Sequence, residues 1–158
     1  MIQCSGARQR PAASAADAVL HADLPADPRS ARQARCAVRR ALDAWGMTDL
    51  SGDTELLASE LVANAVEHAD GKSVGLALRR QADSAGPPAV ICEVSDSSPV
   101  SPQVKDAGPD DERGRGLAIV AALSCASGVR TSPAGKTTWF TVACAQALDR
   151  LAAGKTSE

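Results

Sequence analysis

The sequence has very few aromatic residues. Its 158 residues include two tryptophans, one phenylalanine and no tyrosine, whereas proteins that bind single-stranded nucleic acid stack the bases on aromatic side chains. A positive net charge is also missing, since the formal value is −2 at pH 7. Tight nonspecific binding to nucleic acid depends on many contacts from Lys and Arg to phosphates. We therefore expect no direct nucleic-acid partner.

Long apolar runs are absent as well. No stretch of the sequence approaches the roughly 20 apolar residues that a membrane-spanning helix needs, and Met1 to Arg10 lacks the apolar core of a signal peptide. The five cysteines are scattered without a Cys-x-x-Cys pair, so neither a zinc site nor a disulfide framework is indicated. These absences predict a cytoplasmic protein with reduced thiols and no membrane association.

The length fits a single domain with a hydrophobic core. Residues 1–20 show no clear periodicity and predict a flexible N-terminal tail. Residues 21–152 are predicted to form the folded domain, and residues 153–158 a C-terminal tail.

Apolar spacing within the domain predicts several helices and strands. A helix is expected from Asp27-Pro28 to Gly46, a second from Ser51 to Ala69, a third over Leu117–Leu123 and a short one near 145–152. Strands are expected at Ser73–Arg79, Ala89–Val94 and Lys136–Ala143. The long segment between the last two strands, from Ser97 to Asp111, is typical of a functional loop or a disordered link.

Polar residues border the apolar face of the second predicted helix. At about 100° per residue, Glu60, Asn64 and His68 form one stripe at the edge of that face, while Ser59, Ala63 and Glu67 are expected to face solvent. An amide oxygen can bind Mg²⁺, and a carboxylate one turn earlier can deprotonate a hydroxyl that attacks a phosphate. Taken alone, the pair is more typical of ordinary boundary residues.

Two further segments carry candidate ligand-binding residues. Asp96 follows a buried strand, either as a ligand contact or as the residue that starts a turn. Gly114 and Gly116 precede a predicted helix, either to let backbone amides approach an anion or simply as the helix start. Arg113 to Ala118 also matches the Arg-x-x-Gly-x-Ala pyrophosphate loop of acetyltransferases.

In order along the chain, these segments resemble the motifs of the histidine-kinase-like ATPase superfamily, also called the GHKL or Bergerat fold. ELVANAVEHA from Glu60 resembles its N box, VSDSSP from Val94 its first glycine box, RGRGLAIV from Arg113 its second, and GKTTWF from Gly135 its last strand motif. The short length favours the anti-sigma-factor serine/threonine kinase branch, of the actinobacterial single-domain type. The resemblance covers roughly Leu24 to Val142.

This resemblance implies an α/β fold, more closely an α+β two-layer sandwich in which helices cover one face of a mixed sheet. ATP and Mg²⁺ would bind between helices and a mobile lid formed by Pro99 to Arg113. Asn64 would hold Mg²⁺ and Glu60 would act as the base. Asp96 would bind the adenine amino group with help from the Thr137 hydroxyl. The residues that would border the lid and contact the phosphates are Arg113, Gly114, Arg115, Gly116 and Leu117.

One motif departs from the family pattern. The first box usually reads Asp-x-Gly-x-Gly, but this chain has Asp96-Ser-Ser-Pro-Val100, and side chains there restrict close backbone approach to a nucleotide. We therefore expect weakened ATP binding.

Three functions follow as hypotheses. The first is a kinase that phosphorylates a small anti-anti-sigma-type protein and regulates transcription by partner switching, with a sigma factor as a further or alternative partner. The family resemblance also suggests a homodimer, for which the sequence itself shows no exposed apolar stripe. The second is a noncatalytic regulator that binds ATP weakly and holds a sigma factor or other partner. The third is an acetyltransferase, which leaves Glu60, Asn64 and Asp96 unexplained.

Overall fold

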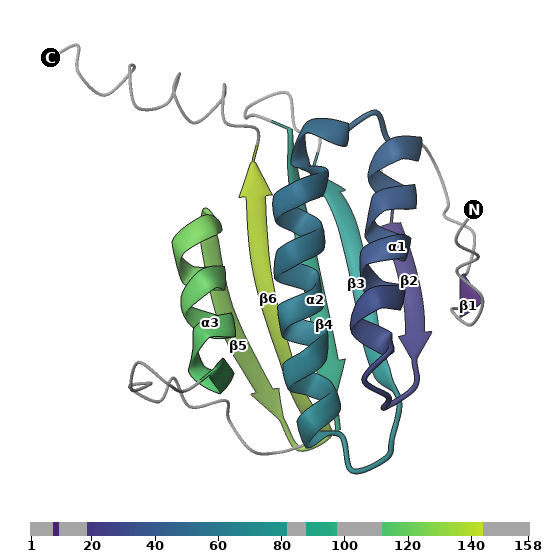
Figure 1. Ribbon diagram of the computed structural model, residues 1–158, viewed down its shortest axis with the longest axis vertical. Coiled ribbons are helices and arrows are strands. Elements are labelled where there is room, and N and C mark those ends of the chain that lie inside the picture. The colour runs from purple at the N-terminus through teal and green to yellow at the C-terminus, as the bar shows by residue number, and fades with distance from the viewer. Residues whose placement is uncertain (1–7, 10–18, 82–87, 98–111, 144–158) are drawn as a thin grey trace, which may run out of the picture.

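The computed structural model describes residues 8–9, 19–81, 88–97 and 112–143, without the side chains at 8, 9, 112–115 and 117. Three α-helices in these ranges lie on one face of a six-stranded sheet (Figure 1). The elements are β1 (Arg8–Gln9), β2 (Val19–Leu24), α1 (Ser30–Ala44), a 3₁₀ turn (Thr48–Leu50), α2 (Ser51–His68), β3 (Val74–Gln81), β4 (Ala89–Asp96), α3 (Glu112–Leu123), β5 (Ala126–Ser132) and β6 (Gly135–Ala143).

The strand order in the sheet is β1-β2-β3-β4-β6-β5. Each described pair of neighbouring strands is antiparallel. The two-layer α+β fold is thus confirmed, but the expected mixed sheet is corrected to an antiparallel one. The reason is that β6 lies between β4 and β5, so these two strands, which point the same way, are not neighbours.

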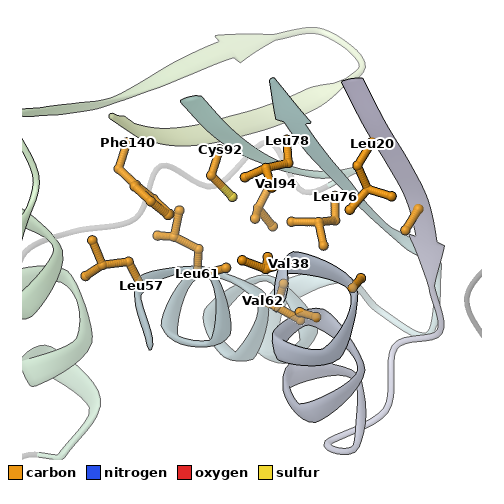
Figure 2. Close-up of a cluster of buried hydrophobic side chains, with 14 of the residues drawn as sticks. Leu20, Val38, Leu57, Leu61, Val62, Leu76, Leu78, Cys92, Val94 and Phe140 are labelled. Carbon is orange, nitrogen blue, oxygen red and sulfur yellow. The ribbon is translucent and has the colours of Figure 1, made fainter. Parts of the chain in front are cut away.

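Strand alternation defines the two faces of the sheet. In β2, β3, β4 and β6 the even-numbered residues point toward the helices and are largely buried, while the odd-numbered residues point to the other face. Figure 2 shows the resulting core, with Leu76, Leu78, Cys92, Val94 and Phe140 of the sheet facing Val38, Leu57, Leu61 and Val62 of the helices. Even or odd position therefore decides whether a strand residue faces α2.

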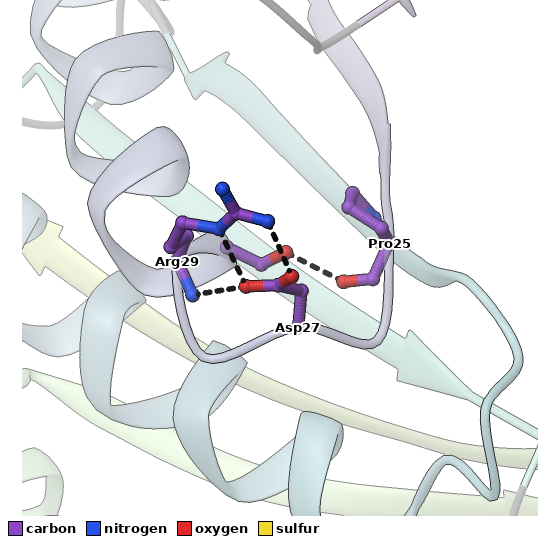
Figure 3. A network of polar contacts seen from close by, with 4 residues as sticks. Pro25, Asp27 and Arg29 are labelled. Carbon is purple, nitrogen blue, oxygen red and sulfur yellow. Dashed lines mark hydrogen bonds and ion pairs between the residues drawn. The ribbon is translucent and has the colours of Figure 1, made fainter.

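The turn that leads into α1 is built around Asp27 (Figure 3), but the N-cap residue of the helix is Arg29 and not the predicted Asp27. Asp27 Oδ1 accepts a hydrogen bond from the Arg29 amide at 2.8 Å and another from Arg29 Nε at 3.1 Å, and these bonds lower the pKa of Asp27 to about 2. Ser30 Oγ donates to the Pro25 carbonyl. The helix itself begins at Ser30, so Pro28 lies in the preceding turn and not in the first helical turn.

The two long helices are joined by an ion pair. Arg39 of α1 donates to both oxygens of Glu55 on α2, at 3.0 and 2.7 Å. α2 runs from Ser51 to His68, which confirms the predicted second helix. Ser59, however, is buried and donates to the Leu56 carbonyl. The prediction that Ser59 faces solvent is wrong because it lies one turn after Glu55, on the side of α2 that α1 covers.

Other predictions have mixed outcomes. Strands β3, β4 and β6 match the predicted segments within two residues. β2 and β5 were not predicted, and β1 with the first residues of β2 falls in the expected N-terminal tail. The segment 99–111 of the expected lid, the short helix near 145–152 and the C-terminal tail lie outside the described residues.

The cysteines differ from one another. Cys36 of α1 is disulfide-bonded, so the prediction of reduced thiols is wrong at this position. Cys92 and Cys125 carry free thiols, the first buried and the second exposed. Among the described residues, no helix combines the length and apolarity required to cross a membrane.

Candidate functional site

The second half of α2 and the first half of α3 meet at Gly116. A Cβ atom built on Gly116 would lie 2.7 Å from Glu60 Oε2 and 3.7 Å from Asn64 Nδ2. Glu60 and Asn64 are both half-buried, which agrees with their predicted place at the border of the apolar face. Three residues of two predicted motifs, separated by more than 50 positions in the chain, thus form one cluster.

The position of the glycines within α3 differs from the prediction. The helix begins at Glu112 and not at Leu117, so Gly114 and Gly116 lie inside it. In an α-helix only the first four amides lack a partner within the helix. The amide of Gly116, the fifth residue, is therefore committed to the helix, and the lack of a side chain at Gly116 instead makes room for the Glu60 carboxylate.

The other acid of the predicted site lies at the end of β4. Asp96 is paired across the sheet with Lys136, the second residue of β6, and both point toward the helices. Lys136 Nζ lies 3.7 Å from Asp96 Oδ2, and the two side chains are only 3% and 2% exposed. The predicted adenine-binding carboxylate therefore has a buried ammonium beside it.

Gly135 brings β6 against this end of β4. Its φ is +140°, which favours glycine, and a Cβ atom there would lie 2.0 Å from the Asp96 carbonyl oxygen. The backbones of β4 and β6 therefore meet directly beside the Asp96–Lys136 pair. In Figure 1 the end of β4, the start of β6, the start of α3 and the end of α2 lie at the same end of the molecule.

Thr137 lies on the opposite face of the sheet from Asp96. Its cross-strand neighbour is Ser95, and the two hydroxyl groups are hydrogen-bonded at 2.9 Å. Because residues alternate along β6, the hydroxyl-bearing residue that points toward the helices is Thr138, opposite Val94. The structure thus does not bring Thr137 to the helix side, where Asp96 lies.

The remaining predicted phosphate-binding residues belong to the start of α3. The backbone of Arg113, Gly114, Arg115 and Leu117 is part of that helix, and their side chains lie outside the described part of the chain. Lys136 is the residue of this region that sequence reasoning missed as a site residue. Its only sequence signal is its place at the start of a strand, which does not reveal a partner across the sheet.

The sequence profile of the histidine kinase-like ATPase domain matches residues 24–142. That range is well over half of the chain, and it contains Glu60, Asn64, Asp96 and Gly116. The chain belongs to this family. The match also includes Arg113 to Ala118, the residues on which the acetyltransferase alternative rests.

A solved structure is similar to this histidine kinase-like ATPase domain. It is the histidine kinase domain from the Erythrobacter litoralis EL346 blue-light activated histidine kinase, with 20% sequence identity and a TM-score of 0.45. The alignment covers 90% of this chain and 70% of the other. A search of curated proteins found no match.

The residues of this ATPase domain fit ATP and Mg²⁺ unequally. The cluster on α2 and α3 supplies a neutral amide oxygen from Asn64 and a carboxylate from Glu60, which are the donor types that Mg²⁺ and a phosphoryl acceptor require. At the end of the sheet where the resemblance predicts adenine binding, Asp96 is buried beside Lys136. The residues expected near the phosphates thus suit ATP and Mg²⁺. The residues expected near the adenine base differ from the family pattern, because the Asp96 carboxylate is accompanied by an ammonium group.

Proposed function

We propose that this chain binds ATP with Mg²⁺ and transfers the terminal phosphoryl group to a serine or threonine of a small anti-anti-sigma-type protein, so that it regulates transcription by partner switching. The observation that carries the proposal is the contact of Gly116 with Glu60 and Asn64. Glu60 and Asn64 belong to the segment that resembles the N box, and Gly116 belongs to the segment that resembles the second glycine box. The two segments therefore lie together in a chain of the histidine kinase-like ATPase family.

In this proposal Glu60 is the general base. Its half-buried carboxylate accepts the proton of the attacking hydroxyl as the hydroxyl oxygen forms its bond to the terminal phosphorus, and the bond to the leaving ADP oxygen breaks. Asn64, one turn later on α2, would hold Mg²⁺ through its amide oxygen, and the bound ion would offset charge on the phosphates. The lack of a side chain at Gly116 leaves room for the Glu60 carboxylate beside α3.

A second candidate is a regulator that binds ATP weakly, transfers no phosphoryl group and acts by holding a sigma factor or other partner. Two observations favour it. Asp96 is buried beside Lys136, and the chain has Ser97 to Val100 where the family usually places two glycines after the acid. Both features reduce the expected affinity for the nucleotide without altering the fold.

The test separates binding from transfer. ATP binding is measured by calorimetry with and without Mg²⁺ on the wild-type protein and on Asn64→Ala, Glu60→Gln and Glu67→Gln. Glu67 is an exposed glutamate on the same helix and serves as the matched control. Phosphoryl transfer from labelled ATP is then measured with a small anti-anti-sigma-type protein of the same organism as acceptor.

We expect Mg²⁺-dependent binding in the wild-type protein that is lost in Asn64→Ala. Glu60→Gln should keep binding and lose transfer by a factor of about 10² to 10⁴, the usual effect of a general base, whereas Glu67→Gln should match the wild type. Binding without transfer in the wild-type protein would establish the second candidate. Absence of binding at millimolar ATP would refute the kinase proposal.

A further inference from the structure

The inference concerns Lys136 and rests on the proposed nucleotide site. Asp96 and Lys136 lie directly opposite each other on β4 and β6, with Nζ 3.7 Å from Oδ2. Their side chains are 2% and 3% exposed, so the charges of the pair are removed from solvent. In such surroundings a buried charge is tolerated only when polar groups compensate it. A base that reaches Asp96 would therefore also lie beside this ammonium.

The two groups have opposite hydrogen-bonding capacity. An ionised carboxylate only accepts hydrogen bonds, and an ammonium only donates them. With position 6 of a purine at this place, a 6-amino group such as that of adenine donates to Asp96. A 6-oxo group has no hydrogen to donate and repels a lone carboxylate, because two acceptors then face each other. The same 6-oxo group is a good acceptor for the Lys136 ammonium.

We propose that Lys136 is a specificity-determining residue that lets the nucleotide site accept 6-oxopurine nucleoside triphosphates as well as ATP. Asp96 accepts a hydrogen bond from the 6-amino group, and Lys136 donates one to the 6-oxo group. The neighbouring ring nitrogen, N1, pairs with the other residue: in adenine N1 accepts from Lys136, and in a 6-oxopurine N1–H donates to Asp96. Because neither side chain faces water, the partner that a base lacks is not replaced by solvent. The loss of one member thus changes selectivity between the two bases.

The first experiment compares ATP with inosine triphosphate, which carries an oxo group in place of the 6-amino group. Calorimetry in the presence of Mg²⁺ gives the ratio of their dissociation constants for the wild-type protein. We expect inosine triphosphate to bind within about tenfold of ATP, because each base finds a hydrogen-bonding partner in the pair. Weaker binding by more than tenfold would overturn the inference even if no variant could be prepared.

The second experiment uses variants of Lys136. Lys136→Met removes the donor and should weaken the binding of inosine triphosphate relative to that of ATP by about ten- to hundredfold. This is the effect of losing a hydrogen bond to a charged group. Lys136→Arg keeps a donor and should preserve the wild-type ratio. Lys72→Met, at an exposed lysine, is the matched control. Because the readout is a ratio, a general loss of stability that weakens both ligands equally does not change it.

The outcomes distinguish this inference from the proposed function. An unchanged ratio in Lys136→Met, with ATP binding that still depends on Asn64, overturns the role of Lys136 and leaves the nucleotide site standing. Binding of both nucleotides without transfer to a protein acceptor overturns the kinase and leaves the role of Lys136 standing. If the wild-type protein binds neither nucleotide, both fail. Thermal unfolding without nucleotide verifies that each variant is folded.

Discussion

Gly116 of α3 and Glu60 of α2 approach so closely that one added methyl group would lie 2.7 Å from the carboxylate oxygen Oε2. The contact brings the middle of one helix against the polar stripe of another, and the atom that would be displaced is the far end of a flexible side chain. A substitution at Gly116 should therefore displace the Glu60 carboxylate without disrupting the fold. Such a variant tests whether phosphoryl transfer depends on the position of Glu60.

We predict that Gly116→Ala keeps or slightly raises the free energy of unfolding, by up to about 1 kcal/mol, because alanine is the better residue inside a helix. Phosphoryl transfer should nevertheless fall by about 100-fold, since a small displacement of a catalytic group is costly. Urea unfolding and a transfer assay measure the two effects.

The matched control is Gly52→Ala. Gly52 is also a helical glycine, in the first turn of α2, and a Cβ atom there meets nothing within 4 Å. This variant should keep wild-type transfer. Equal losses in the two variants would contradict the positional argument.

Gly135→Ala should behave in the opposite way and destabilise the fold. A Cβ atom there would lie 2.0 Å from the Asp96 carbonyl oxygen, and the φ of +140° is unfavourable for alanine. We expect a loss of about 2–4 kcal/mol in the free energy of unfolding. Gly71→Ala, with φ +77° and open space, isolates the conformational cost and should lose only about 1–2 kcal/mol. A smaller loss at Gly135 than at Gly71 would show that β4 and β6 do not meet as described.

The ion pair between the long helices predicts a pH dependence. Burial raises the pKa of Glu55, but hydrogen bonds from Arg39 and Ser51 outweigh it, so the pKa lies below its ordinary value of 4.5. A pKa that is lower in the folded state stabilises the fold above the unfolded-state pKa, and this contribution is lost as the pH falls through the folded value.

Arg39→Met should therefore raise the pKa of Glu55 and lower stability at neutral pH. The difference from the wild type should shrink as the pH falls below 4.5. NMR titration of Glu55 and urea unfolding at several pH values measure these changes, with Arg40→Met as the control at an exposed arginine of the same helix. A difference that is constant across the pH range would argue against the pair as its source.

The two free thiols in the described part of the chain, Cys92 and Cys125, should react at very different rates. Cys92 is fully buried, and burial raises the pKa of its thiol, whereas Cys125 is exposed. Because the thiolate is the reactive form, a maleimide should label Cys125 in the native protein and Cys92 only after unfolding. Peptide mapping by mass spectrometry separates the sites. Labelling of native Cys92 at the rate of Cys125 would place it outside the core.

Several elements could be predicted from local sequence. α2 has the predicted start, and its end differs by one residue, because its apolar spacing and the position of Gly71 shortly after the helix agree on its extent. β5 could not be predicted in this way. Its burial is low along nearly its whole length, so it carries no alternating pattern, and its pairing with β6 holds it in the sheet. β2 does alternate, with Leu20, Ala22 and Leu24 buried, but its first two residues fall within the predicted tail, where the alternation is too short to indicate a strand.

The sequence by itself determined that Glu60 and Asn64 share one edge of a helix, because a spacing of four residues places two side chains on the same face of any α-helix. It also determined, through the order of its motifs, the family to which the chain belongs. Only the tertiary structure decided that Gly116 meets Glu60, that Lys136 lies beside Asp96 and that Thr137 faces away from it. The physical reason is that strand register and helix packing are set by contacts between distant parts of the chain, and a shift of one residue turns each strand side chain to the opposite face.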